Sequence, residues 1–274
     1  MKGKGTLIFL IIFFIGVCVF CYPMFSQYWN SRLHIDQITV YDEILSANET
    51  KDYTDEFDKA YEYNKKLNKL TFPLTQYKNL KNYDDILNVN GAGMMGYVSI
   101  DKIKVELPIY HGTSAKVLNS AVGHMEGTSL PVGGKSTHSV LSAHRGLSSA
   151  KLFTDLGKLE VGDTFTVTIY DQKLTYQIDQ VMIVEPNDIT YLQVVKGEDY
   201  LTLVTCTPYG LNTHRLLVRG TRIENPSQMK LTVTNEAYRV DKLVVTTAIA
   251  LPILVVLIIY VMVKPVNTRR RDDD

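Results

Sequence analysis

The sequence predicts a mostly β domain, folded as a closed or nearly closed antiparallel barrel, with a membrane-spanning helix on each side. Two apolar runs, 6–25 and 243–263, lie near the chain ends, and each has about the 20 residues that a spanning helix needs. Between them, over 95–223, short segments rich in valine, isoleucine, tyrosine and threonine alternate with turn residues. Such evenly spaced short strands are typical of barrels.

The flanking charges predict how the two runs are oriented. Lys2 and Lys4 precede the first run, and no small-x-small cleavage site follows it, so we expect an uncleaved anchor in preference to a signal peptide. Lys264 and Arg269 to Arg271 follow the second run. By the positive-inside rule both termini are expected in the cytoplasm, and the residues between the runs are expected outside the cell.

The residues between the two runs divide into an N-terminal part, up to residue 92, and a β-rich part beyond it. From residue 50 to Leu67, apolar side chains recur at three- and four-residue steps, which predicts an amphipathic helix. Residues 27–48 are polar and aromatic with no clear period. Beyond residue 92 we expect seven strands, at 95–100, 105–110, 139–143, 164–170, 174–184, 200–205 and 214–223.

These elements give a division of the chain into six parts. They are a cytoplasmic N-terminus with its anchor, an N-terminal helical and lid region, a catalytic β-barrel, a linker, a second transmembrane helix and a cytoplasmic tail, at 1–28, 29–92, 93–225, 226–242, 243–263 and 264–274.

Charge and motifs exclude several classes of partner. Lysines plus arginines and aspartates plus glutamates both number 29, so the net charge gives no indication of a nucleic-acid partner. The outer part contains no Cys-x-x-Cys, no His-Glu-x-x-His and no acidic calcium loop, so we expect no metal. Phosphate-binding glycine loops are also absent from the sequence, and we expect no cofactor.

Cys206 is the candidate nucleophile. The other two cysteines, Cys18 and Cys21, lie in the first apolar run, so Cys206 has no disulfide partner in the outer part of the chain. An unpaired thiol outside the cell is exposed to oxidation, which favours a functional thiol. A small buried core residue is the alternative.

Two further side chains can complete a site around this thiol. His144 follows the strand 139–143, at a point where side chains leave the core, and is a candidate general acid and base. His214 and Arg215 begin the strand after Cys206, and because successive strand residues face opposite sides, only one of them can point at the thiol. We expect Arg215, whose planar fork suits a substrate carbonyl or an oxyanion.

Five motifs in order resemble those of the sortases, and specifically the class C, pilin-polymerising branch. They are Met95-Gly-Tyr-Val-Ser-Ile100, Leu107-Pro-Ile-Tyr-His-Gly-Thr113, Gly123-His-Met-Glu-Gly-Thr-Ser-Leu-Pro131, Thr137-His-Ser-Val-Leu-Ser-Ala-His-Arg-Gly146 and Thr202-Leu-Val-Thr-Cys-Thr-Pro-Tyr-Gly-Leu-Asn-Thr-His-Arg215. The resemblance covers about 93–223, and a span on each side of the domain is also similar to class C architecture.

The resemblance implies a fold and a reaction. The fold is a closed eight-stranded sortase-type β-barrel with an N-terminal helical and loop layer and a transmembrane helix at each end. Cys206 is implied as nucleophile, His144 as acid and base, and Arg215 as the cation that binds substrate and oxyanion; Thr205 and Tyr209, in the same motif, are expected to bind substrate. The implied reaction cleaves a Leu-Pro-x-Thr-Gly-like sorting signal between threonine and glycine and joins the acyl group to a pilin lysine at the cell membrane.

One segment departs from the class C pattern, and two other functions remain open. Class C enzymes carry a lid with an Asp-Pro-aromatic tripeptide, whereas this chain has Phe72-Pro73-Leu74, so no acid is available there to pair with Arg215. We expect an open cleft or a looser, hydrophobic lid. A sortase that anchors surface proteins to a peptidoglycan precursor would use the same catalytic residues, and a catalytically inactive tethered binding domain is the third hypothesis.

Overall fold

The computed structural model describes residues 2–47, 51–89, 91–147 and 149–225. The predicted linker, second span and tail, 226–274, lie outside the described residues. Within the described part, one helix is long and apolar enough to cross a membrane: residues Ile11–Ser46 of helix α1 (Lys2–Ser46), with a mean hydropathy of 1.7 over their most apolar stretch.

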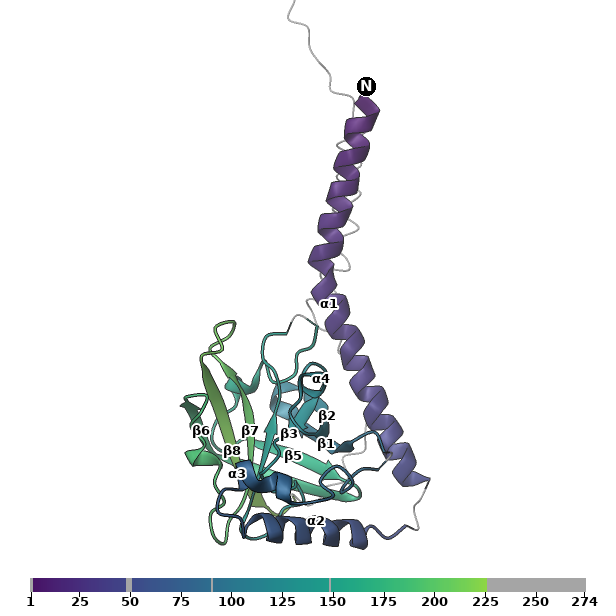
Figure 1. The fold of residues 1–274 in the computed structure, drawn as a ribbon. Coiled ribbons are helices and arrows are strands. Elements are labelled where there is room, and N and C mark those ends of the chain that lie inside the picture. Colours follow the sequence, from purple (N-terminus) through teal and green to yellow (C-terminus); the bar gives the residue numbers. More distant parts are fainter. Residues whose placement is uncertain (1, 48–50, 90, 148, 226–274) are drawn as a thin grey trace, which may run out of the picture. The chain divides into compact units, whose positions relative to one another are not determined.

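Helix α1 continues through residues 27–46, where the sequence showed no clear period and we expected the N-terminal layer to begin (Figure 1). The sequence shows no clear period there because the side chains that α1 turns toward the barrel mix polar and apolar types. They recur at helical spacing and comprise Asn30, His34, Ile38, Tyr41 and Leu45.

Hydrogen bonds hold this part of α1 to the barrel. The Tyr41 hydroxyl donates to the carbonyl of Met95 (3.0 Å) and accepts from the backbone N–H of Tyr170 (2.7 Å). Asn30 Nδ2 donates to the carbonyl of Ser149 (2.7 Å), and the His34 ring contacts the carbonyl of Ser120.

Eight strands close the barrel, as the resemblance implied. Around the barrel they run β1 (Met94–Ile100), β2 (Val105–His111), β3 (Val122–His124), β4 (Thr137–Ser142), β7 (Asp199–Thr207), β8 (His214–Ile223), β6 (Gln172–Val184) and β5 (Thr164–Ile169). Seven of them match the predicted strands; the three-residue β3 was not predicted.

The barrel is mixed and not antiparallel, which corrects the expectation from strand spacing. β2 pairs with β3 in parallel, and β4 pairs with β7 in parallel. Parallel neighbours need a crossover connection. The first crossover contains the short helix α4 (Ala115–Leu118), and the second spans 143–198 and includes β5 and β6.

One fully buried aliphatic side chain from each strand fills the centre of the barrel. In spatial order these are Val98, Ile109, Val122, Leu141, Leu203, Val218, Ile178 and Val167. This closed apolar interior fixes which residues of each strand face inward, and so which face outward.

The amphipathic helix expected before the barrel is α2 (Thr54–Leu67). Its buried face carries Phe57, Ala60, Tyr63 and Leu67, which belong to the barrel's core cluster. Asn64, only 3% exposed, makes a reciprocal pair with one backbone unit: its Nδ2 donates to the carbonyl of Leu130 (3.2 Å) and its Oδ1 accepts from the Leu130 N–H (2.7 Å). After α2 come the short helix α3 (Pro73–Gln76) and a 3₁₀ turn at Tyr77–Asn79. Three more 3₁₀ turns lie in connections between barrel strands, at Asp101–Ile103, Leu156–Lys158 and Thr190–Leu192.

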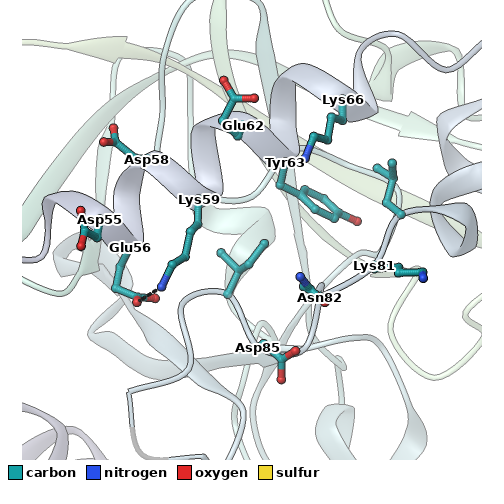
Figure 2. Close-up of a pocket in the computed structure, with 12 residues that line it drawn as sticks. Asp55, Glu56, Asp58, Lys59, Glu62, Tyr63, Lys66, Lys81, Asn82 and Asp85 are labelled. Carbon is teal, nitrogen blue, oxygen red and sulfur yellow. Dashed lines mark hydrogen bonds and ion pairs between the residues drawn. The ribbon is translucent and has the colours of Figure 1, made fainter.

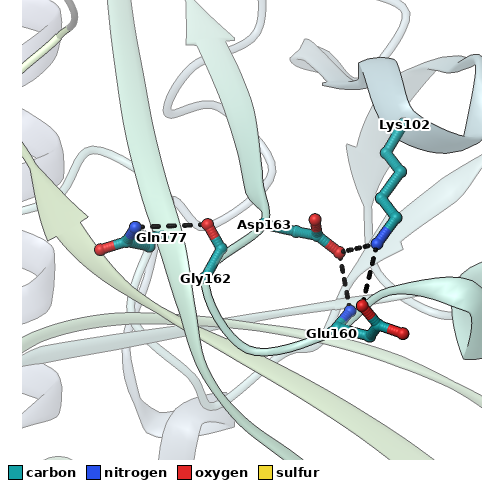
Figure 3. Close-up of polar contacts among 5 residues, drawn as sticks. All are labelled: Lys102, Glu160, Gly162, Asp163 and Gln177. Carbon is teal, nitrogen blue, oxygen red and sulfur yellow. Dashed lines mark hydrogen bonds and ion pairs between the residues drawn. The ribbon is translucent and has the colours of Figure 1, made fainter.

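Two predicted turns meet at the surface of the barrel. Lys102 Nζ lies 2.8 Å from Asp163 Oδ2 and 3.4 Å from Glu160 Oε2, and Gln177 Nε2 donates to the carbonyl of Gly162 at 3.2 Å (Figure 3). The turn after β1 is thereby joined to the turn before β5. Because exposed ion pairs contribute about 0–1 kcal/mol, this contact fixes geometry more than stability.

Replacing Asn64 with alanine is expected to destabilise the fold by about 2 kcal/mol, because the N–H and carbonyl of Leu130 lose their partner inside the protein. The measurement is the thermal unfolding midpoint of the full chain in detergent. Asn68→Ala is the matched control: Asn68 is exposed and donates to the carbonyl of Ser136, and its loss should cost no more than about 0.5 kcal/mol. Equal losses in the two variants would contradict the assignment.

Candidate active site

Cys206 is the penultimate residue of β7 and is partly exposed. In the antiparallel pairing of β7 with β8, the residue directly opposite Cys206 is Arg215, and His214 is opposite Thr207. Paired residues of neighbouring strands point to the same face of a sheet. The register therefore brings Arg215 to the face of Cys206, and directs His214 to the other face.

His144 lies just beyond the end of β4, on the other side of β7. The parallel register pairs Ser142 with Val204, and one further backbone bond, from Ala143 N–H to the carbonyl of Val204 (3.1 Å), continues it. Two residues on, the same register leads from Ser142 to His144 and from Val204 to Cys206. Cys206 and Arg215 thus form one row across β7 and β8, and the β4–β7 register directs His144, two residues beyond the end of β4, toward that row.

That row lies on the outer face of the barrel. Leu201 and Leu203 point into the interior core, so Thr202, Val204 and Cys206 point the opposite way. Val204 belongs to a separate apolar group, which we call the outer apolar cluster; its members are Val140, Val184, Leu192, Val204 and Leu217, with Met125 and Met182 packed against them. An apolar surface therefore extends along the barrel from the candidate nucleophile.

The segment between β6 and β7, residues 185–198, covers this surface through Leu192 and is tied down by His138. The His138 ring lies between two partners, with Nδ1 2.9 Å from the carbonyl of Gln193 and Nε2 2.7 Å from the hydroxyl of Thr202. Donation from Nδ1 to the carbonyl and acceptance at Nε2 suit a neutral ring. Burial lowers the pKa of His138, which favours that neutral form.

Arg215 forms no ion pair within the residues that the structure describes. Its Nη1 donates to two backbone carbonyls, those of His214 (3.1 Å) and Asn212 (3.3 Å). The three remaining guanidinium N–H donors, on Nε and Nη2, are left for a ligand on this face. No acidic side chain from 60–89 or 91–92 pairs with Arg215, so the structure contains no ionic latch there.

The two residues expected to bind substrate differ in accessibility. Thr205 is 2% exposed, and its hydroxyl donates to the carbonyl of Ala143 (2.8 Å), so its side chain joins β7 to the chain that leads to His144 and is not available to a substrate. Tyr209 is 62% exposed, and its ring lies against Gly146. A methyl group at Gly146 would come within 2.9 Å of that ring, so this position needs glycine.

The lid tripeptide is placed between two loops of the barrel. Pro73 begins α3, and the Pro73–Leu74 backbone contacts Gly127 so closely that a Cβ there would lie 2.7 Å from Leu74 Cα. A cavity of about 30 Å³ separates Leu74 from Leu192 and His138. Phe72, by contrast, is 64% exposed. Leu74, not Phe72, therefore faces the outer apolar cluster.

The rest of the N-terminal layer is anchored by buried polar contacts. The Tyr83 hydroxyl bonds Nδ1 of His124 (2.8 Å), and Nε2 of the same ring lies 2.9 Å from the carbonyl of Ser129. This geometry suits a neutral ring that donates from Nε2. His124 is fully buried, and desolvation lowers its pKa to about 4. His111 contributes a second tie, with Nε2 2.7 Å from the carbonyl of Ile86.

A larger cavity, of about 740 Å³, opens between α2 and residues 80–86 (Figure 2). Its wall carries both carboxylates and lysines, including the ion pair of Glu56 with Lys59 (2.6 Å). None of Cys206, His144 and Arg215 lines it. In the part of the chain that the structure describes, no group of three or more histidine, cysteine, aspartate or glutamate side chains could hold a metal ion.

Sequence reasoning missed the contacts that build the surroundings of the site. The tie from His138 to Gln193 joins residues 55 positions apart, and the outer apolar cluster draws on five strands or loops that lie far apart in the chain. The only signal in the sequence was that His138 directly precedes the predicted strand 139–143, which leads to His144.

Comparisons with known proteins agree with this architecture. The sequence model of the sortase domain family matches residues 98–223. The crystal structure of sortase C1 from Streptococcus agalactiae is similar at 48% identity and a TM-score of 0.63, over 70% of this chain and 100% of that one. Streptococcus pneumoniae sortase C is similar at 43% identity and a TM-score of 0.62, over 69% and 97%.

A curated relative, sortase D of Bacillus subtilis (strain 168), is 32% identical over 131 residues, which are 47% of this chain and 63% of that protein. The chain thus covers less than two thirds of the length of this relative. The likeness to the two solved structures, at higher identity, extends over nearly their whole length.

Lowering the pH from 7 to 5 is expected to destabilise the fold, with His124 contributing on the order of 2 kcal/mol. The unfolded chain binds a proton at His124 below its ordinary pKa of 6.5, whereas the folded protein binds it only near pH 4, so stability is lost as the pH falls through this window. The measurement is the unfolding midpoint at both pH values. His138 adds a loss of the same sign, so His124→Gln should reduce the pH dependence without abolishing it; an unchanged dependence would contradict this role for His124.

Proposed function

Because this chain belongs to the sortase family, and its structural neighbours are class C sortases, we propose that it is a cysteine transpeptidase that cleaves a sorting signal and polymerises pilin subunits. The observation that supports the proposal is the pairing of Cys206 with Arg215 on the outer face of the barrel, with His144 two residues beyond the end of β4, the parallel neighbour of β7. A thiol, an imidazole and a guanidinium in that order supply the nucleophile, the proton carrier and the oxyanion partner of acyl transfer.

The first half-reaction forms an acyl-enzyme. The Cys206 thiolate attacks the threonine carbonyl of a Leu-Pro-x-Thr-Gly-like signal, and Arg215 binds the oxygen on which negative charge develops. His144, as the imidazolium, gives its proton to the departing glycine amine. The carbon–nitrogen bond breaks, and a thioester between threonine and Cys206 remains.

The second half-reaction transfers the acyl group to an amine. A lysine side chain of another pilin subunit attacks the thioester, His144 takes the proton that this amine loses, and the sulfur leaves as thiolate. The product is an isopeptide bond. The solved structure of Streptococcus pneumoniae sortase C gives insight into pilin substrate specificity, and its 43% identity to this chain supports a pilin acceptor over a peptidoglycan precursor.

The proposal places the enzyme at the cell membrane, with the barrel outside and both termini in the cytoplasm. The apolar part of α1 supports an N-terminal anchor. Tyr22, Tyr28 and Trp29 are exposed on α1 just before its contacts with the barrel begin, and aromatic side chains of this kind favour the membrane–water boundary. The charge pattern at 264–271 supports a second anchor.

Incubating the full chain in detergent with a Leu-Pro-x-Thr-Gly peptide and a lysine-containing pilin peptide is expected to give one covalent product, with the mass of the two peptides less the released glycine fragment. Cys206→Ala should form neither acyl-enzyme nor product, and Arg215→Ala should fold but turn over roughly 10²-fold more slowly, as on losing an oxyanion donor. Mass spectrometry identifies the product. Joining to a wall-precursor amine but not to the pilin lysine would favour the anchoring function, and no labelling of Cys206 by a mild electrophile would favour an inactive binding domain.

We further propose that Phe72-Pro73-Leu74 acts as a loose hydrophobic lid through Leu74. Leu74 faces the outer apolar cluster across a small cavity, and no ion pair with Arg215 holds the segment in place. A lid held only by such contacts opens at little cost.

Leu74→Ala is therefore expected to raise the rate of Cys206 alkylation two- to fivefold, on the order of what losing a partly buried contact of about 1 kcal/mol produces. The measurement is the time course of alkylation by a sorting-signal-like electrophile. Phe72→Ala is the matched control, because Phe72 is exposed, and it should react at the wild-type rate. If Phe72→Ala raised the alkylation rate and Leu74→Ala left it at the wild-type value, the roles assigned to the two side chains would be reversed.

A further inference from the structure

The strand that leads to His144 separates from β7 just before the histidine. Its final ties to β7 there are the bond from Ala143 N–H to the carbonyl of Val204 (3.1 Å) and the bond from the Thr205 hydroxyl to the carbonyl of Ala143 (2.8 Å). The carbonyl of His144 itself accepts from the N–H of Phe153 (3.2 Å), away from β7. The β-ladder therefore fixes Cys206 but leaves the position of His144 to other contacts.

Arg145 supplies such a contact. Its Nη1 donates to the hydroxyl of Thr207 at 3.0 Å, in a partly buried position. Arg145 directly follows His144, and Thr207 directly follows Cys206, so one hydrogen bond joins the neighbours of the proposed proton carrier and the proposed nucleophile.

The chain around Arg145 is fastened on both sides of this bond. Gly146 N–H donates to the Thr154 hydroxyl (3.1 Å), and the ring of Tyr209 packs on Gly146, whose φ of +78° and lack of a Cβ allow the approach. The turn that carries His144 is thus packed against the turn that follows Cys206, and the Arg145–Thr207 bond lies between the two.

The hydrogen bonding of Arg145 is otherwise incomplete. Its Nε is buried without a hydrogen-bond partner, and no carboxylate among the described residues forms an ion pair with it. A buried donor without a partner costs stability, so a guanidinium at this place is not explained by folding alone. Local costs of this kind occur where a side chain serves a site.

We propose that Arg145 is a positioning residue for the transpeptidation reaction: its bond to Thr207 sets the separation of the His144 imidazole from the Cys206 thiol. This inference rests on the proposed function, and it adds a residue that does not itself touch the substrate. Small displacements of a proton carrier from its nucleophile reduce the rate of the chemical step while leaving substrate binding unchanged.

The test compares Arg145→Gln, Thr207→Val and the double variant in the peptide-joining assay, with kcat expressed per folded molecule. Each single variant is expected to lower kcat about tenfold or more and to leave KM for the sorting-signal peptide within about twofold. The double variant should be no slower than Arg145→Gln, because both changes remove the same bond. The folded fraction of each variant is taken from its thermal unfolding curve, which separates positioning from a loss of folded enzyme.

Two controls accompany these variants. Thr207→Ser keeps the hydroxyl and should retain wild-type kcat. Arg222→Gln removes a guanidinium at a different part of the barrel, where Nη1 donates to the carbonyls of Thr175 and Ile223, and it should also retain wild-type kcat. Wild-type kcat in Thr207→Val, or losses that add in the double variant, would overturn the proposal, and the pair Thr207→Val and Thr207→Ser decides it if Arg145→Gln does not fold. No product from the wild type would overturn the proposed function and this inference together, whereas product from the wild type and equally from the variants overturns the inference alone.

Discussion

The candidate site depends on the register of β7 between its two neighbours. β4 runs parallel to β7 and β8 runs antiparallel to it; the β7–β8 register places Cys206 and Arg215 in one row, and the β4–β7 register directs the chain toward His144 beside it. Side chains alternate along a strand, so a slip of one residue in either pairing would send a member of this row to the other face. The interior side chains prevent such a slip, because Leu201 and Leu203 would have to leave the core and face solvent.

The N-terminal layer is attached to the same framework by polar contacts more than by apolar area. Asn64 pairs with the backbone of Leu130, and Tyr83 bonds the buried ring of His124, so residues from the layer satisfy groups that the barrel cannot satisfy by itself. Buried polar groups of this kind specify one docking geometry, because a shifted layer would leave them unpaired. Leu74 lacks such a bond, and the lid is therefore the part of the layer that is held least specifically.

A structural feature could be predicted from the sequence when the interactions behind it join residues close together in the chain. The strands, α2 and the Cys206–Arg215 hairpin depend on alternation and on residues a few positions apart, and the sequence predicted them. β3 has three residues, too few for a pattern, and the stripe of α1 beyond Trp29 mixes Asn30 and His34 with apolar side chains. The parallel pairing of β4 with β7 joins segments 62 residues apart and was not predicted, so His144 was a candidate from its place at a strand end and from the family resemblance alone.

Backbone bonds hold some residues of the candidate site and side-chain contacts hold others, which explains why the site lies where the strands end. Cys206 and Arg215 are still within the ladder, which holds them as firmly as the barrel itself, whereas His144 has just left it. In the proposed reaction the proton carrier gives a proton to the departing amine in one half-reaction and takes one from the attacking amine in the other, and a residue outside the ladder can adjust to both. The same freedom would let it drift, since no strand bond restrains it. Side-chain contacts such as that of Arg145 with Thr207 limit this drift without closing the face on which a substrate must bind.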